Sequence, residues 1–203
     1  MSQDMLGTSA LAEVAGPLKD FAERLGGSRG TQWLGAFKRF LRKEEPWPKF
    51  TVWKTIKLGM EHRALDFDAR RIRILQDVLV SFNTVSFAVT VVEVELVVLT
   101  TTELGFKVVP RYEDIWRRAL EWGLELCPAE VGPQLRLQYL DQPRDDRLRI
   151  AMNPVVVAGS RRDEEWVYEM GCDKDSILWL DGIHPDARSY DALSRRWVFV
   201  QPR

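Results

Sequence analysis

Cysteine and histidine are the residues of this chain best suited to nucleophilic chemistry, and each occurs only twice. Cys127 lies in the segment 126–130 (LCPAE), directly after a short strand-like run. A cysteine acts as a nucleophile when its thiolate is stabilised and a base lies nearby. His184 occurs in the turn-like segment 181–186 (DGIHPD), which also contains Asp181. A small hydrolase or transferase that uses a catalytic set of Cys127, His184 and Asp181, or the acidic residues near Asp181, is therefore one hypothesis. A buried structural cysteine is the favoured alternative, because no protease or oxidoreductase signature surrounds Cys127.

The sequence gives even less evidence for a metal site, a cofactor site or a catalytic acid–base pair than for a catalytic cysteine. The cysteines and histidines are not paired at the short spacing that metal ligands show, so we expect no metal site. Asp145 and Asp146 fall in a polar segment that is typical of a solvated turn. The glycines of residues 26–30 follow no strand and precede no Lys-Ser/Thr pair, so they do not form a phosphate-binding loop. The sequence indicates no cofactor.

Tryptophan is unusually frequent, with eight residues in 203. Trp166, Trp179 and Trp197 fall in the C-terminal half, where their rings could line a binding face and stack on a sugar, a base or a partner's side chain. Packing in the core is the favoured alternative, because a tryptophan ring is large and is usually mostly buried.

Cations and aromatic residues alternate in the segment 38–57, which includes Lys38, Arg42, Trp47 and Trp53. Such a pattern can follow a nucleic-acid backbone and stack on its bases, so a nucleic-acid accessory protein is a further hypothesis. The alternative is an amphipathic helix with a solvated basic face. The net charge of the whole chain is −1, which does not favour a polyanion partner.

The chain is predicted to consist of a short leader, a helical extension and one domain. Residues 1–16 are expected to be a flexible leader. Residues 17–48 are expected to form a helical N-terminal extension, because Pro17 suits a first helical turn and apolar residues then recur at helical spacing. Pro46 and Pro48 end this extension, which places the α+β domain at residues 49–203.

The remaining chain reads as one central strand–helix step followed by short strands. Residues 50–58 and 85–100 are rich in β-branched residues and predict strands, and residues 112–120 have helical spacing. Residues 60–84 fit either short helices or strands. Further strand-like runs lie at 124–126, 135–140, 148–152, 165–169, 177–180 and 197–200. We therefore predict an α+β fold with N-terminal helices, a central strand–helix step and a mainly antiparallel C-terminal β-sheet.

Several segments together resemble a family of small bacterial hypothetical proteins that is frequent in environmental genomes. The most specific is the run GLELCPAEVGPQLRLQY at residues 123–139. The likeness extends over residues 53–203 and includes 53–59 (WKTIKLG), 102–106 (TELGF), 148–152 (LRIAM) and 196–200 (RWVFV). The resemblance implies a bacterial origin and one shared domain, and it implies no activity.

The leading functional hypothesis is a non-catalytic binding or interaction module that acts on a protein or another macromolecule. It rests on the lack of a convincing acid–base pair, nucleotide loop or metal cluster in the sequence. No signal peptide is recognisable and no apolar stretch approaches the roughly 20 residues of a membrane span, so we expect a cytoplasmic protein without a membrane partner.

Overall fold

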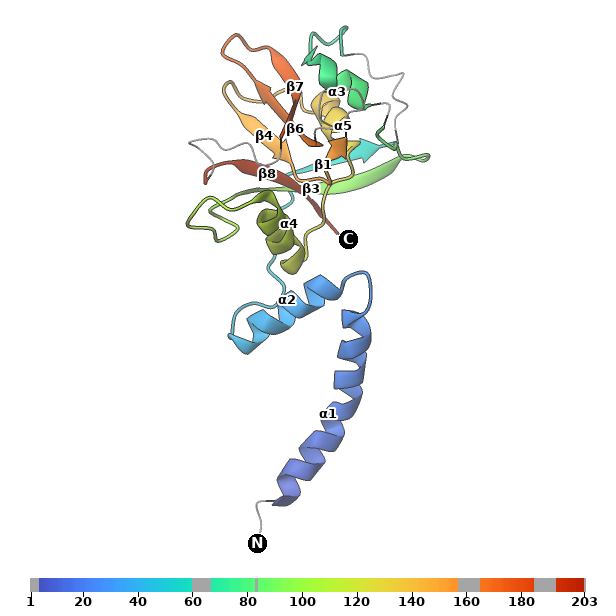
Figure 1. The fold of residues 1–203 in the computed structure, drawn as a ribbon, viewed down its shortest axis with the longest axis vertical. Coiled ribbons are helices and arrows are strands. Elements are labelled where there is room, and N and C mark those ends of the chain that lie inside the picture. The colour runs from blue at the N-terminus through green and yellow to red at the C-terminus, as the bar shows by residue number, and fades with distance from the viewer. Residues whose placement is uncertain (1–3, 60–66, 83, 157–164, 185–192, 203) are drawn as a thin grey trace. The chain divides into compact units, whose positions relative to one another are not determined.

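The computed structural model describes residues 4–59, 67–82, 84–156, 165–184 and 193–202 (Figure 1). Its internal contacts divide the chain into two compact units. The first unit contains residues 1–48 together with 120–123, and the second contains residues 49–119 and 124–203.

The first unit is built on a helical hairpin. Helix α1 spans Asp4–Leu25 and helix α2 spans Gly30–Leu41. Residues 4–16, expected as a flexible leader, are helical, and Pro17 lies inside α1 rather than in its first turn. The difference arises because the segment before Pro17 is rich in alanine and leucine, which favour a helix.

Helix α2 buries a face of small and polar residues. The buried residues are Gln32, Gly35, Ala36 and Arg39. An added Cβ at Gly35 would lie 2.5 Å from the carbonyl oxygen of Glu121, so this face packs closely against main chain. The guanidinium of Arg39 donates hydrogen bonds to the carbonyl oxygens of Pro46 and Glu121, which satisfies its buried charge with main-chain acceptors.

The second unit is organised around one sheet. Among the described residues, eight strands pair in the order β1-β3-β8-β4-β6-β7-β2, with β5 beside β6. The strands are β1 (Lys54–Leu58), β2 (Arg73–Ile74), β3 (Val92–Thr100), β4 (Arg147–Ile150), β5 (Val155–Val156), β6 (Glu165–Cys172), β7 (Leu178–Ile183) and β8 (Arg196–Gln201).

The sheet is mixed, which corrects the prediction of a mainly antiparallel C-terminal sheet. The C-terminal strand β8 lies between β3 and β4, antiparallel to the first and parallel to the second. β2 also pairs in parallel with β7. Strands from the first half of the chain therefore share the sheet with those from the second. This insertion of β8 leaves it buried from Trp197 to Val200, as a strand that is covered on both faces should be.

Three helices accompany the sheet: α3 (Gln76–Ser81), α4 (Tyr112–Glu121) and α5 (Val131–Gln138). The predicted helix at 112–120 is confirmed by α4, and it follows β3 as expected. The predicted strand at 135–140 is wrong, because most of that run belongs to α5. Every residue of α5 from Val131 to Leu137 is buried, since the helix lies within the curl of the sheet against β1, β6 and β7 (Figure 1). A helix that is enclosed on all sides does not show a single apolar stripe, so its sequence resembles an alternating strand.

The core of the second unit is formed by α5 and the central strands. A satellite cluster of Phe67, Ile72 and Leu137 is completed by Ile74, Phe82 and Leu178. On α4, Trp116 packs edge-on against Trp197 of β8, with ring centroids 5.6 Å apart, and donates a hydrogen bond to the carbonyl oxygen of Met152. In the part of the chain that the structure describes, no helix has the length and apolar character needed to cross a bilayer.

Candidate functional site

Cys127 is buried in the second unit. Its side chain is 3% exposed, and its thiol lies 3.3 Å from the carbonyl oxygen of Val198 in β8. Burial raises the pKa of the Cys127 thiol far above its usual range, so the thiol stays protonated at neutral pH. A protonated, enclosed thiol lacks the nucleophilicity that the catalytic hypothesis requires.

The proposed partners of Cys127 lie on another part of the sheet. Asp181 belongs to β7, where it pairs with Glu169, and its carboxylate accepts a hydrogen bond from the main-chain N–H of Gly182. His184 follows β7 and is exposed. Strand β7 is three positions from β8, a separation along the sheet of about 14 Å. Asp181 and His184 therefore belong to a different part of the sheet from the strand that Cys127 contacts.

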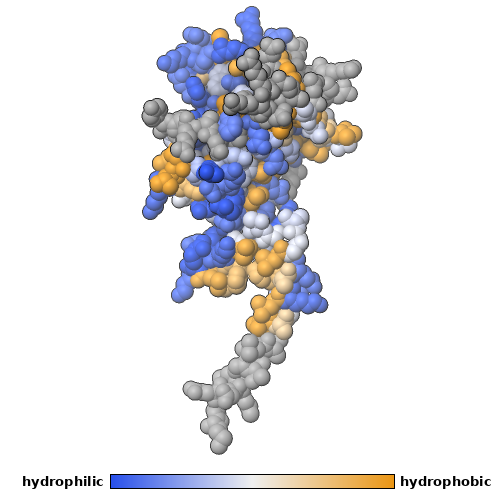
Figure 2. All heavy atoms as spheres, viewed as in Figure 1, coloured by the Kyte–Doolittle hydropathy of each residue, from blue (hydrophilic) through white to orange (hydrophobic). Residues whose placement is uncertain are grey.

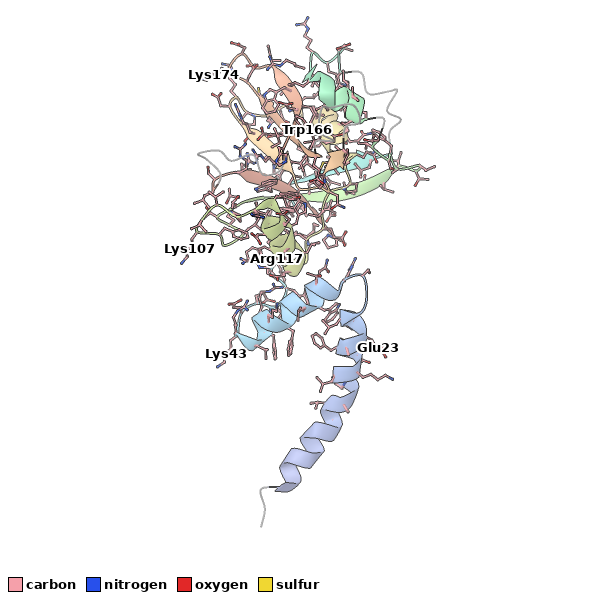
Figure 3. The ribbon with its side chains drawn as sticks, in the orientation of Figure 1. Glu23, Lys43, Lys107, Arg117, Trp166 and Lys174 are labelled. Carbon is pink, nitrogen blue, oxygen red and sulfur yellow. The ribbon has the colours of Figure 1, made fainter. Side chains whose placement is uncertain are left out.

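The three C-terminal tryptophans pack inside the second unit. Trp179 is 9% exposed and Trp197 is 3% exposed. The ring of Trp179 covers Gly171 on the neighbouring strand. Trp166 lies among the strands of the second unit (Figure 3) and is half-buried, and its ring covers Gly182 in the same way. These rings fill the space left by glycines and do not form an open stacking face.

The predicted basic–aromatic segment is divided between the two units. In the first unit Lys38 is exposed, Arg42 is paired with Glu44 at 2.8 Å, and the ring of Trp47 packs edge-on against Trp33. Trp53 belongs to the second unit and directly precedes Lys54, which lines a groove of the structure.

This groove follows strand β1, which lies at one end of the strand order. It has a volume of about 440 Å³ and is lined by Lys54, Thr55, Ile56, Arg70, Leu137, Gln138 and Leu140. The volume lies in the range of ligand-binding pockets in proteins. Ile56 and Leu137 are buried and give an apolar floor, whereas Leu140 is 49% exposed at the rim.

The side chain of Gln138 closes one end of the groove by pairing with the main chain of β1. Its amide oxygen accepts a hydrogen bond from Lys57 N at 3.0 Å, and its amide nitrogen donates to Lys57 O at 2.9 Å. Gln138 thus occupies the position of a neighbouring strand. Because alternate residues of a strand direct their main-chain groups to the same edge, the N–H and C=O of Thr55 face this groove.

Two cations line the groove, and one of them, Lys54, contacts a pair of aromatic rings next to it. Trp53 and Tyr139 form an edge-on pair with ring centroids 5.0 Å apart, and the ammonium of Lys54 lies 4.7 Å from the centroid of Tyr139. Arg70 donates a hydrogen bond to Leu137 O at 2.9 Å, which fixes its guanidinium at the wall. None of the described lining residues carries a carboxylate, an imidazole or a thiol.

The buried side chain of Arg136 stabilises the wall of the groove through hydrogen bonds. Arg136 donates hydrogen bonds to Gln142 Oε1 and to the carbonyl oxygens of Tyr139 and Gly171. Burial lowers the pKa of Arg136 to about 10, so the guanidinium is still charged at neutral pH. Its contacts fix the segment that follows α5, including Leu140.

Polar residues recur every fourth position along α5 and connect the helix to main chain elsewhere. Glu130 precedes the helix and is 1% exposed. Its carboxylate accepts hydrogen bonds from Gly59 N at 2.5 Å and from Ala88 N at 2.8 Å. Gln134 and Gln138 follow at the same spacing, and Gln138 donates to Gln134 O as well as to β1. This row holds α5 against β1 and so sets the width of the groove.

Sequence reasoning missed Arg70, Glu130 and Gln138. The spacing of Glu130, Gln134 and Gln138 is a helical signal inside the run 123–139, and it could have identified α5. Nothing in the sequence pairs Arg70 with this run, because residue 70 and residue 137 meet only through the fold.

A second cluster of buried charges lies within the sheet. Glu169 accepts hydrogen bonds from Arg149 at 3.1 Å and from Arg195, and the three side chains are 6–8% exposed. The guanidinium of Arg149 also lies 5.5 Å from the ring centroid of Trp197. The two arginines and the glutamate form ion pairs with one another inside the core, so we assign the cluster a structural role.

Among the described residues, no group of three or more His, Cys, Asp or Glu side chains is placed to hold a metal ion. Both cysteines are free thiols. Comparison of the chain with protein-family models, with curated proteins and with solved structures finds no match. The bacterial family resemblance over residues 53–203 therefore stays a prediction.

Proposed function

We propose that this protein is a non-catalytic binding module of the bacterial cytoplasm, and that the groove along β1 is its binding site. The observation that carries the proposal is the main-chain edge at Thr55 between the Gln138–Lys57 pair and the Trp53–Tyr139 pair. An edge strand that faces a groove is a common place for an extended peptide to add by main-chain hydrogen bonds.

The lining of the groove favours an acidic peptide segment. Lys54 and Arg70 contribute two positive charges, and no described lining residue is acidic. Ile56 and Leu137 give an apolar surface for a neighbouring side chain of the ligand. A segment in which an acidic residue alternates with an aliphatic one matches this order of charge and apolar surface along the strand.

Fluorescence anisotropy with labelled six-residue peptides tests this proposal. The acidic set alternates Glu or Asp with Leu or Val, and the control set carries Lys at the acidic positions. We expect only the acidic set to bind, with an affinity that falls as salt rises. Lys54→Gln and Arg70→Gln should each weaken binding about tenfold, because each removes a charged hydrogen-bond donor. Lys107→Gln and Lys174→Gln, exposed elsewhere in the second unit (Figure 3), should have no effect.

A pair of variants at Thr55 separates main-chain recognition from simple charge attraction. Thr55→Pro removes the N–H that faces the groove, and proline is tolerated on an edge strand in this orientation. Thr55→Val keeps the N–H. We expect Thr55→Pro to abolish peptide binding and Thr55→Val to retain it. Equal binding by both variants, or tight binding of a dT oligonucleotide with none of the acidic peptides, would overturn the proposal, and the second result would favour the nucleic-acid accessory hypothesis.

A further inference from the structure

Gln138 limits how far an added strand can extend along β1. Its side-chain amide already bonds to both main-chain groups of Lys57, at 3.0 and 2.9 Å, so these groups are occupied. At the other end of the groove, the main-chain N–H of Trp53 donates to Leu96 O on β3 at 2.7 Å. Thr55 is therefore the position between them at which a ligand can pair. Because neighbouring residues of a strand lie about 3.3 Å apart, the ligand must end or turn away within about 7 Å of Thr55 on the Gln138 side.

A positive charge lies at this closed end of the groove. Arg70 is exposed, and its guanidinium donates to the carbonyl oxygen of Leu137, the residue next to Gln138. A guanidinium has five N–H donors in a geometry that suits a carboxylate, and the bond to Leu137 uses one of them. The C-terminal end of α5 carries about half a negative charge, which is smaller than the full positive charge of Arg70. The closed end of the groove therefore attracts an anionic group.

We infer that the groove binds the free C-terminal end of an acidic chain, which lies parallel to β1 with its α-carboxylate on Arg70. This inference rests on the proposed function and names the kind of peptide that the groove selects. β1 runs from Lys54 toward Lys57, so a parallel ligand has its α-carboxylate beside Gln138, whereas an antiparallel ligand has its α-ammonium there. The charge of Arg70 attracts the first group and repels the second.

The register along β1 also specifies the last residue of the ligand. In a parallel pair, the N–H and the C=O of one residue bond to the residues before and after its partner on the other strand. The C=O of Thr55 would therefore accept the N–H of the final ligand residue, which lies beside Ile56. Side chains alternate between the faces of a sheet, so the final side chain shares the face of Ile56. Ile56 and Leu137 are 1% and 5% exposed and form an apolar floor there, so we expect an aliphatic final residue.

Three peptides that share one acidic sequence ending in leucine test the inference by fluorescence anisotropy, with the label at the N-terminus. The first has a free C-terminal carboxylate, and the second has a C-terminal amide. The third continues with three glycines to a free carboxylate, so it has the same net charge as the first. We expect the full chain to bind the first peptide and to bind the other two at least tenfold more weakly. The amide loses the charged hydrogen bond to Arg70, and the extension meets Gln138.

Variants of the two residues at the closed end should change the preference in different ways. Arg70→Gln should bind the free and amidated peptides about equally, because the carboxylate no longer has a charged partner, whereas Arg70→Lys should retain a preference. Gln138→Ala uncovers Lys57, so it should bind the extended peptide more tightly than the wild type does. Circular dichroism checks that each variant keeps its fold.

The first unit provides a control for non-specific adsorption of the peptides. Figure 2 shows apolar side chains gathered over α2 and the adjoining part of α1, a surface to which an aliphatic side chain can adhere. Leu41→Asp places a charge in this surface, at a site 64% exposed, and should leave all three affinities unchanged.

The outcomes separate the inference from the proposed function. Equal affinity of the wild type for the free peptide and either of the other two would overturn the inference and leave the proposed function intact. Binding of none of the three peptides would overturn both. A preference for the free carboxylate that persists unchanged in Arg70→Gln would also overturn the inference, because another group would then hold the carboxylate.

Discussion

Glu130 is predicted to hold the groove together by fixing α5 to two distant segments. Substitution of Glu130 by glutamine keeps the shape of the side chain but replaces one carboxylate oxygen with an NH₂ group. The two oxygens of Glu130 accept one main-chain N–H each, from Gly59 and Ala88. One of these N–H groups would then face a donor, in a site where the side chain is 1% exposed.

The cost follows from the number and kind of hydrogen bonds lost. A hydrogen bond to a charged group contributes about 1.5–3 kcal/mol, and a buried donor without a partner costs about 1–3 kcal/mol. We therefore expect Glu130→Gln to lower the free energy of unfolding of the second unit by about 3 kcal/mol. For a chain of this length this corresponds to a fall in Tm of roughly 5–15 °C. Glu165→Gln is the matched control, because Glu165 is exposed at the start of β6.

Urea unfolding measures the loss of stability, and native-state hydrogen exchange locates it. The amides of Gly59 and Ala88 should exchange faster in Glu130→Gln, whereas the amide of Lys57, which Gln138 holds at the other end of α5, should lose protection only as far as global stability falls. Unchanged exchange protection of the Gly59 and Ala88 amides, with a stability change below about 0.5 kcal/mol, would refute the conclusion that Glu130 fixes α5 to these two segments.

Three further outcomes test the packing around α5 and the sheet. Burial raises the pKa of Tyr168 to about 12, above the value near 10 in an unfolded chain, so its contribution to stability is complete below pH 10 and is lost as the pH rises from 10 to 12. Urea unfolding at pH 9.5 and 11 should therefore show a smaller alkaline loss in Tyr168→Phe than in the wild type, and equal losses would contradict this. Gly132→Ala would place a Cβ 2.3 Å from the ring of Tyr168, so the free energy of unfolding should fall by about 1–3 kcal/mol, and an unchanged value would show that the ring can move. Iodoacetamide should modify Cys127 only after denaturation, as followed by mass spectrometry, and His184→Ala should not alter that rate. Fast labelling of the native protein that depends on His184 would restore the catalytic hypothesis.

The parts of the fold that sequence predicted are those with a clear periodicity. Alternation of β-branched residues identified β1 and β3, and helical spacing identified α4. The start of β3 was predicted seven residues too early, at 85 rather than at Val92, because the apolar run continues through an irregular segment. Local composition cannot distinguish an extended segment that pairs from one that does not.

The parts that sequence did not predict depend on contacts between distant segments. The insertion of β8 between β3 and β4 makes the sheet mixed, and no local pattern in residues 196–201 specifies which strands it will join. α5 was taken for a strand because Arg136 and Gln138 alternate with leucines. In the fold both polar side chains find main-chain partners on other segments, so a helix surrounded by protein can carry them.

The proposed function requires the groove to protect a sheet edge and still admit one kind of ligand. An uncovered edge strand invites pairing with any extended chain, and proteins limit this by covering the edge or by placing charges beside it. Here Gln138 covers β1 at Lys57, which leaves a stretch around Thr55 too short for a long strand to add. Lys54 and Arg70 flank that stretch and repel basic segments while they attract acidic ones. Under the proposed function, the features that prevent indiscriminate strand pairing would also select a short acidic ligand. The Thr55→Pro and Arg70→Gln variants should then lose binding for different reasons, because the first loses a main-chain donor and the second loses charge.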